Sequence, residues 1–247
     1  MIPLKSKEDL LMLGKSGKIL SRVMRELKRF VRVGVTTQEI DNLAQELVQR
    51  EKAVAAFKGY KQFPASVCTS VNEEIVHGIP GERKLAEGDI LSLDLGINYQ
   101  GYFSDAAVTL ALGRVDPRVV KLIRVAHEAL AKGIKEARVN HHLFDISYAI
   151  QSYVEQNGFS VVREFVGHGI GRNLHEEPEI PNFGRRHNGP LLKSGMVLAI
   201  EPMVNMGTWE SRISENGWTA LTKDGLPSAH FEHTVAITDE GPKILTF

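Results

Sequence analysis

The stretch Gly88-Asp89-Ile90-Leu91-Ser92-Leu93-Asp94 has a counterpart 107 residues later, Gly195-Met196-Val197-Leu198-Ala199-Ile200-Glu201. Each begins with glycine, continues with residues typical of a buried strand and ends with a carboxylate. At an offset of 106, Arg32-Val33-Gly34 matches Arg138-Val139-Asn140, and glycine and asparagine both suit a left-handed turn after a helix. The sequence therefore predicts a duplicated α+β unit, with halves of roughly 1–113 and 114–247 packed into one domain around a shared site.

Four helices are expected beside these strands. The first begins after Ser6, an N-cap residue with Asp9 three positions on, and is predicted to end at Gly34. The second begins at the capping box Thr36-Thr37-Gln38-Glu39. Further helices are predicted at about 117–137 and 143–156, and strands at 66–71, 89–95 and 101–112, with a hairpin connection at 96–101.

Composition excludes several classes of protein. Thirty basic residues balance thirty acidic ones, which argues against nucleic-acid phosphate or an anionic membrane as the main partner, and no specific DNA binding is expected. No uncharged stretch reaches the length of a membrane span, and the first residues lack the layout of a secretory signal. The single cysteine, Cys68, cannot form an internal disulfide, so a cytoplasmic location is expected.

Five polar residues stand at or beside strand positions where apolar residues are the rule. Four are acids and one is a histidine between glycines: Asp94, Asp105, His168, Glu201 and Glu232. Converging buried carboxylates repel one another, so they must take up protons or bind cations. Oxygen ligands with one imidazole suit a pair of divalent ions about 3.5–4 Å apart. The alternative is that each acid ends a strand alone and faces water.

Other histidines are candidates for proton transfer. His77 precedes Gly78-Ile79-Pro80 and His175 follows Arg172-Asn173-Leu174, and either side chain suits polarisation of a carbonyl or protonation of a leaving amine. The alternative for both is a turn residue that caps backbone groups. His230 and His233 flank Glu232 and are expected to contact metal ligands rather than to be ligands. The glycines beside His168 are expected to let a ligand approach the backbone.

Several motifs occur together over nearly the whole chain. They are Ser70-Val71-Asn72-Glu73, His77-Gly78-Ile79-Pro80, Asp94 and Asp105 eleven residues apart, Gly167-His168-Gly169-Ile170-Gly171, His175-Glu176, Ile200-Glu201-Pro202 and Ser228-Ala229-His230-Phe231-Glu232-His233-Thr234. With these motifs the chain resembles the type I methionine aminopeptidases. The resemblance implies the α+β pita-bread (creatinase/aminopeptidase) fold, in which two pseudo-symmetric helix-helix-strand halves surround a curved antiparallel sheet. It places metal ligands at Asp94, Asp105, His168, Glu201 and Glu232, and makes residues 1–247 a single catalytic domain.

The resemblance also implies a reaction. The N-terminal (initiator) methionine of nascent proteins is removed by hydrolysis when the second residue is small. A hydroxide bridging two divalent ions (Co, Mn, Fe or Zn) attacks the scissile carbonyl, with Glu201 as general base. His175 stabilises the oxyanion and His77 contacts the scissile amide or the residue after methionine. The methionine side chain is expected against Phe57, Tyr60, Phe63, Cys68 and Trp218, although ordinary core packing is the alternative for Phe57 and Phe63.

Some positions depart from the family pattern, and two other functions remain open. His230 stands where glutamine is frequent, Leu174 where an aromatic residue is frequent, and Gly96 and Ala106 where hydroxyl residues are frequent. The first alternative is an X-Pro aminopeptidase or prolidase, which shares the fold and metals but usually carries an additional N-terminal domain. The second is a non-catalytic, metal-free peptide-binding protein on the same fold, although such relatives have usually lost metal ligands.

The first helix also carries a basic stripe. Its members step by three and four residues: Lys15, Lys18, Arg22, Arg25, Arg29 and Arg32. If the substrate is a chain emerging from the ribosome, this stripe is a candidate for transient contact with ribosomal RNA. The alternative is an ordinary solvated helix face.

Overall fold

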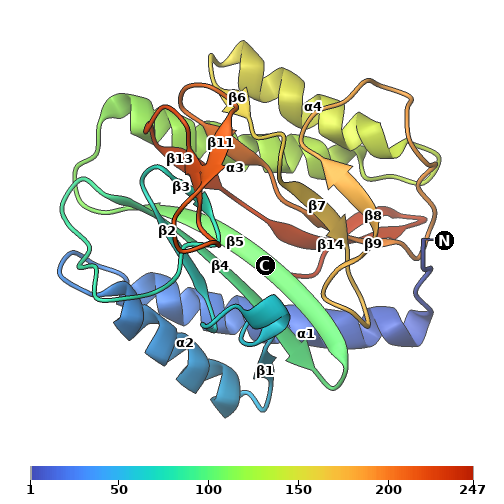
Figure 1. The fold of residues 1–247 in the computed structure, drawn as a ribbon. Helices are drawn as coiled ribbons and strands as arrows, with labels where there is room; N and C mark the ends of the chain where they lie inside the picture. The colour runs from blue at the N-terminus through green and yellow to red at the C-terminus, as the bar shows by residue number, and fades with distance from the viewer. Residues whose placement is uncertain (1, 247) are drawn as a thin grey trace.

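A computed structural model describes residues 2–246 (Figure 1). Four α-helices lie outside a set of antiparallel sheets. They are α1 (Lys7–Phe30), α2 (Thr37–Arg50), α3 (Pro117–Glu136) and α4 (Leu143–Gln156). In Figure 1, α1 and α2 lie along one edge of the molecule and α3 and α4 along the opposite edge, with the strands between the two pairs. The predicted α+β class with antiparallel strands is confirmed.

The helices begin where their capping residues predict. Ser6 with Asp9, and Thr36 with Glu39, form reciprocal capping boxes at α1 and α2. The prediction that α1 reaches Gly34 is wrong, because the chain leaves the helix at an extended Val31 and Gly34 donates a 2.7 Å hydrogen bond to Leu85 instead. Gly34 (φ +92°) and its counterpart Asn140 (φ +69°) do adopt left-handed conformations, each four residues past its helix.

The longest strands form a hairpin, β4 (Ile90–Tyr99) and β5 (Tyr102–Ala111). Strand β4 continues through the predicted 96–101 connection, so that only Gln100 and Gly101 turn the chain. A second sheet has the order β15-β14-β9-β7-β8. The remaining bounds are β1 Val54–Ala55, β2 Cys68–Val71, β3 Glu74–Val76, β6 Ser160–Val161, β7 Val166–Gly169, β8 Glu176–Pro181, β9 Val197–Ile200, β10 Met203–Asn205, β11 Ser211–Ile213, β12 Ala220–Thr222, β13 Ser228–His230, β14 His233–Thr238 and β15 Gly241–Ile244, with a 3₁₀ turn at Tyr60–Gln62.

The hairpin and the second sheet meet edge to edge. Ala107 of β5 and Glu232, just before β14, exchange backbone hydrogen bonds of 3.4 and 3.0 Å. Beside them the Thr234 hydroxyl accepts a hydrogen bond from the Asp105 amide (2.9 Å) and donates one to the Asp105 carbonyl (2.8 Å). This junction brings acids from the two sequence halves together.

Two of the apolar core clusters follow the two sequence halves, while a third combines residues from both. One core cluster lies within residues 19–112, and another is built largely from α3, α4 and the strands after them. The predicted boundary near residue 113 falls between β5 and α3. Gly88 and its counterpart Gly195 both have φ +92°. Among the described residues, none of the helices has the length and hydropathy that crossing a membrane requires.

Candidate metal and peptide site

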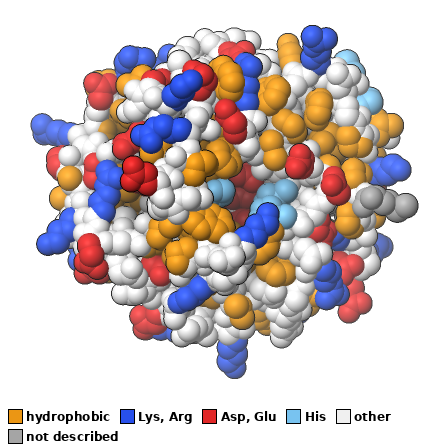
Figure 2. Space-filling view, in the orientation of Figure 1, with side chains coloured by type: hydrophobic (Ala, Val, Ile, Leu, Met, Phe, Trp, Pro, Cys, Tyr) orange, Lys and Arg blue, Asp and Glu red, His pale blue; other side chains and the backbone are white. Residues whose placement is uncertain are grey.

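A cavity of about 270 Å³ opens where the two sheets meet. Figure 2 shows it as a hollow with acidic side chains in its floor and histidines on either side. All twelve residues predicted for the site line it: Phe57, Tyr60, Phe63, Cys68, His77, Asp94, Asp105, His168, His175, Glu201, Trp218 and Glu232. The tertiary structure therefore gathers positions spread over about 175 residues into one cavity.

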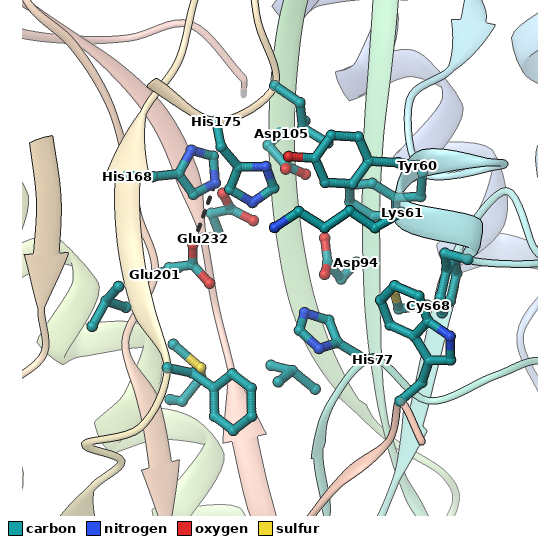
Figure 3. A pocket seen from close by; sticks show the side chains of 18 of the residues that line it. Tyr60, Lys61, Cys68, His77, Asp94, Asp105, His168, His175, Glu201 and Glu232 are labelled. Atoms are coloured by element: carbon teal, nitrogen blue, oxygen red, sulfur yellow. Dashed lines mark ion pairs between the residues drawn. The ribbon is translucent and has the colours of Figure 1, made fainter. Parts of the chain in front are cut away.

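The five candidate ligands, hereafter the acid-histidine cluster (Asp94, Asp105, His168, Glu201 and Glu232), come from five neighbouring chain segments (Figure 3). Asp94 lies in β4 and Asp105 in β5, where Asp105 pairs with Gly96. His168 lies in β7. Glu201 follows β9 directly and Glu232 directly precedes β14, and the pairing of Ile200 with His233 sets these two acids opposite each other.

The cluster has a tight centre. One ligand atom each from Asp105, His168 and Glu232 lies within 4.8 Å of the other two. Glu201 extends this centre, since its Oε1 is 3.6 Å from His168 Nε2. Asp94 is outside the group of three but lines the same cavity, and its carboxylate faces the centre in Figure 3.

Burial and mutual repulsion define the electrostatics of the cluster. Burial raises the pKa of Asp105 to about 7. The pKa values of Asp94, Glu201 and Glu232 lie well above their ordinary range, chiefly from burial and then from the neighbouring carboxylates. Asp94 Oδ1 and Glu232 Oε1 are buried without a hydrogen-bond partner among the described residues. Oxygen atoms left unpaired at the centre of such a cluster fit divalent cations, which supply the missing positive charge.

His168 is prepared as a neutral ligand. Its Nδ1 is 2.9 Å from the carbonyl oxygen of Gly169, an arrangement in which Nδ1 carries the proton and the Nε2 lone pair faces the acids. Burial lowers the pKa of the ring to about 3, so the imidazole stays uncharged at neutral pH. This is the protonation state that metal ligation requires.

The glycines on either side of His168 have a packing reason that the sequence did not show. A Cβ at Gly167 would lie 2.4 Å from the carbonyl oxygen of Ala199, and one at Gly169 would lie 2.1 Å from that of Glu177. The missing side chains therefore admit the neighbouring strand backbones. Their contribution to the site is indirect, because they let β7 pack closely enough for His168 to reach the acids.

The two predicted substrate histidines lie on different sides of the cavity. His175 stacks on Tyr60 (ring centroids 5.2 Å apart, 19°) and lies 4.2 Å from the His168 ring. His77 adopts a left-handed φ of +60° after β3 and packs edge-on against Phe165 and Trp218. Burial lowers the pKa of both, that of His77 to about 4, so both are neutral near pH 7.

The predicted methionine-binding residues form an apolar wall. Phe63 meets Trp218 edge-on at 5.2 Å. Cys68 pairs with Asp94 across β2 and β4, and burial raises the pKa of its thiol well above the usual value, so it remains protonated. Gly96 is a glycine for a packing reason, because a Cβ there would lie 2.7 Å from the Phe57 ring.

The side chains of His230 and His233 point to different parts of the structure. His230 Nε2 lies 3.5 Å from Glu201 Oε2, beside a candidate ligand as expected. The expectation for His233 is wrong: its Nδ1 is 3.0 Å from Thr246 Oγ1, and the side chain lines a separate groove between α1 and α3. Strand alternation explains the difference, since His233 begins β14 next to the inward-facing Glu232.

Several lining residues were not predicted. They are Lys61, Val76, Glu164, Phe165, Val166 and Met203, joined by the already noted Leu174. Lys61 and Gln62 both have positive φ (+44° and +72°), and Figure 3 shows the Lys61 side chain reaching into the cavity near His175. The resemblance placed Phe57, Tyr60 and Phe63 of this segment in the site but not Lys61, because a lysine and a glutamine carry no sequence signal for a left-handed conformation.

Helix pairs outside antiparallel sheets, with an acid-rich cavity at their junction, define a metallopeptidase of the pita-bread class. A model of the metallopeptidase family M24 matches residues 12–239. The chain belongs to this family.

Within this family, the chain is most similar in sequence and length to methionine aminopeptidases among the relatives compared. The methionine aminopeptidase of Clostridium perfringens is 52% identical over 246 residues, covering 100% of this chain and 99% of that protein. The crystal structure of the Thermotoga maritima methionine aminopeptidase superimposes with a TM-score of 0.98 at 45% identity, covering 100% of this chain and 99% of that one. The prolidase of Pyrococcus furiosus shares the fold (TM-score 0.80, 22% identity), but the chain covers only 65% of it. The predicted resemblance and the pita-bread fold are confirmed.

Proposed function

We propose that the chain is a metal-dependent aminopeptidase that removes the N-terminal methionine of nascent polypeptides and prefers a small second residue. The observation that carries the proposal is one cavity with the acid-histidine cluster in its floor and the aromatic residues Phe63 and Trp218 in its wall. The floor suits hydrolysis and the wall suits a thioether side chain. Relatives named methionine aminopeptidase, which match over their full length, support the same function. The likeness to the prolidase is limited to the fold.

Two divalent ions, drawn from Co, Mn, Fe and Zn, are part of the proposal. The ligands would be Asp94, Asp105, His168, Glu201 and Glu232. When bound, such ions supply Lewis acidity toward a carbonyl and lower the pKa of water. The unpaired oxygens of Asp94 and Glu232 support this ligand set.

The remaining chemistry belongs to side chains of this chain. Glu201 accepts the proton of the attacking water, a role suited to a buried carboxylate with a raised pKa. His175, neutral and stacked on Tyr60, donates a hydrogen bond to the oxyanion that develops on the carbonyl. His77, on the opposite side, contacts the scissile amide or the second residue. Phe57, Tyr60, Phe63, Cys68 and Trp218 hold the methionine side chain and exclude water.

A peptide comparison tests this function. The metal-loaded protein is expected to release methionine from Met-Ala-Ser and to leave an X-Pro peptide intact, and preference for the X-Pro peptide would refute the proposal. Chelation should abolish turnover, and each metal added back in turn identifies the active ion. Asp105→Ala should abolish turnover and lower metal stoichiometry. Peptide binding without any turnover in the loaded wild type would favour the non-catalytic alternative.

The proposal covers the chain as one catalytic domain, residues 1–247, built from two halves. Separate apolar clusters in the halves and a shared cavity between them support it. A cytoplasmic location is also proposed, on the ground that Cys68, the chain's one cysteine, is a free and buried thiol.

Transient contact with the ribosome through α1 is the final part of the proposal. All six stripe residues are exposed. Arg22 is paired with Glu51 and Arg29 with Glu26, so the cations that make no ion pair within residues 2–246 are Lys15, Lys18, Arg25 and Arg32.

Co-sedimentation with ribosomes tests this contact. Binding should fall steeply with salt, because phosphate contacts release counterions, and should fall again when Lys18, Arg25 and Arg32 are changed to glutamate. Reversing three exposed cations of α3, Arg118, Lys132 and Lys135, provides the matched control. Equal loss in both triple variants, or no salt dependence, would refute the contact.

A further inference from the structure

The turn that carries His175 is closed by the side chain of the next residue. This turn, Gly171 to His175, connects β7 to β8. Glu176 Oε1 accepts hydrogen bonds from the backbone N–H groups of Arg172 (2.8 Å) and Asn173 (3.0 Å). One carboxylate oxygen therefore fixes the backbone from which the His175 side chain projects.

The other oxygen of Glu176 is held by the N-terminal segment. The Lys5 ammonium pairs with Oε2, and both side chains are only 7% exposed. The backbone of Lys5 is anchored in turn, because its N–H donates a 2.7 Å hydrogen bond to the Gly195 carbonyl. A buried carboxylate needs such a counter-charge, since removing one partner of a buried pair leaves an uncompensated charge.

The pair also explains the last glycine of the Gly167–Gly171 motif. A Cβ at Gly171 would lie 2.6 Å from Lys5 Nζ and 2.9 Å from Glu176 Oε1. The ammonium and carboxylate occupy the space that a side chain would fill. Residues from position 5, from the 171 turn and from β8 thus form one packed unit behind His175.

We propose that Glu176 is a positioning residue for His175, and that the ion pair with Lys5 holds the Glu176 side chain in place. The inference rests on the proposed role of His175 in the reaction. The His175 ring stacks on Tyr60 (5.2 Å) and lies 4.2 Å from the His168 ring, tilted by 39°, so its orientation depends on where the turn places its backbone. A relaxed turn would move the imidazole away from the developing oxyanion while leaving the acid-histidine cluster intact.

Three variants separate positioning from general stability. Glu176→Ala removes both hydrogen bonds to the turn and leaves the buried Lys5 ammonium without its ion-pair partner. Glu176→Gln combined with Lys5→Met restores a neutral, packed arrangement, since the glutamine Oε1 still accepts both N–H groups. Glu210→Gln combined with Lys223→Met removes an exposed Lys–Glu pair (2.7 Å) and serves as the matched control.

Four measurements are made on each variant. Amide hydrogen exchange of Arg172 and Asn173 in the metal-free protein reports the turn directly. Steady-state kinetics of the metal-loaded enzyme on Met-Ala-Ser separates kcat from KM, and thermal unfolding with Mn²⁺ stoichiometry checks fold and metal binding.

The proposal predicts faster exchange in Glu176→Ala and a fall in kcat of roughly 10–100-fold at similar KM and metal stoichiometry. The neutral double variant should recover slow exchange and most of kcat, and the control pair should change neither. When His175 has already been changed to alanine, adding Glu176→Ala should lower kcat little further.

Four results would count against the proposal. Unchanged exchange in Glu176→Ala would show that Glu176 does not hold the turn. If Glu176→Ala lowers kcat by the same factor when His175 is already alanine, Glu176 acts independently of His175. Wild-type activity of His175→Ala with the expected exchange pattern would refute the role of His175 itself, a failure distinct from that of the turn. If Glu176→Ala does not fold, the neutral double variant decides, and its failure to retain slow exchange and kcat counts against the proposal.

Discussion

Nε2 of His230 lies 3.5 Å from Oε2 of Glu201, and Nε2 of His168 lies 3.6 Å from the other oxygen of that carboxylate, Oε1. His230 is 1% exposed, and neither ring nitrogen has a hydrogen-bond partner among the described residues. Burial lowers its pKa to about 3, so the ring is neutral and has one N–H to direct at Glu201. The proposed general base is therefore placed between two imidazoles.

The first prediction concerns this contact. His230→Gln keeps a donor of similar reach and should retain most activity, whereas His230→Leu should lower kcat roughly 10–100-fold, because Glu201 loses its orienting partner. Steady-state kinetics on Met-Ala-Ser, with metal stoichiometry as the control, checks the effect. Equal activity of the glutamine and leucine variants would contradict it.

The second prediction is a pH dependence of the metal-free protein. Burial raises the pKa of Asp105 from the ordinary 3.8 to about 7 in the folded protein, so its contribution to stability is full below pH 4 and is lost as pH rises through 7. The buried histidines act in the opposite direction but only below about pH 6.5, where the unfolded chain takes up protons. The melting temperature of the metal-free protein should therefore fall between pH 6.5 and 8.

Asp105→Asn provides the control for this pH dependence. It removes one of the mutually repelling groups, so the metal-free variant should lose part of the slope and melt higher than wild type at pH 8. Saturating Mn²⁺ should flatten the wild-type curve, because a cation favours the charged carboxylates. A flat curve for the metal-free wild type would contradict the assignment of raised pKa values.

The third prediction separates binding from folding in the methionine wall. Trp218 is half-buried, so Trp218→Ala should raise KM for methionine peptides a few-fold, in line with about 0.3–1.5 kcal/mol for a sulfur–aromatic contact, with little change in stability. Phe63 is 5% exposed, so Phe63→Ala should both raise KM and destabilise the fold by about 3–5 kcal/mol. Denaturant unfolding beside kinetics distinguishes the two, and an unchanged KM in both variants would remove them from the site.

The fourth prediction concerns Lys61 at the cavity mouth. After burial, the Lys61 charge is what lowers the pKa of His175, so Lys61→Ala should raise that pKa toward 6.5. Histidine NMR titration of the metal-free protein measures the shift. Lys58→Ala is the matched control, because Lys58 is exposed and bonds to Gln45 rather than lining the cavity. The same shift in both variants would show that Lys61 has no specific influence.

Much of this structure was predictable because it depends on local chemistry. Capping residues and apolar periodicity determine the four helices, and alternation identifies β4 and β5. Acids at strand positions identified the acid-histidine cluster, since burying a carboxylate without a partner is costly wherever the strand lies. Motif order was enough to identify the family.

Other features depended on contacts between distant segments. No local pattern shows that Lys5 meets Glu176, that His230 faces Glu201 while His233 faces away, or that Gly167 and Gly169 admit neighbouring strands. The end of α1 was mispredicted for the same reason, because the hydrogen bond from Gly34 to Leu85 competes with another helical turn. The sequence by itself determined which side chains carry the chemistry. The tertiary structure alone decided their orientation, because strand pairing and close packing act between residues far apart in the chain.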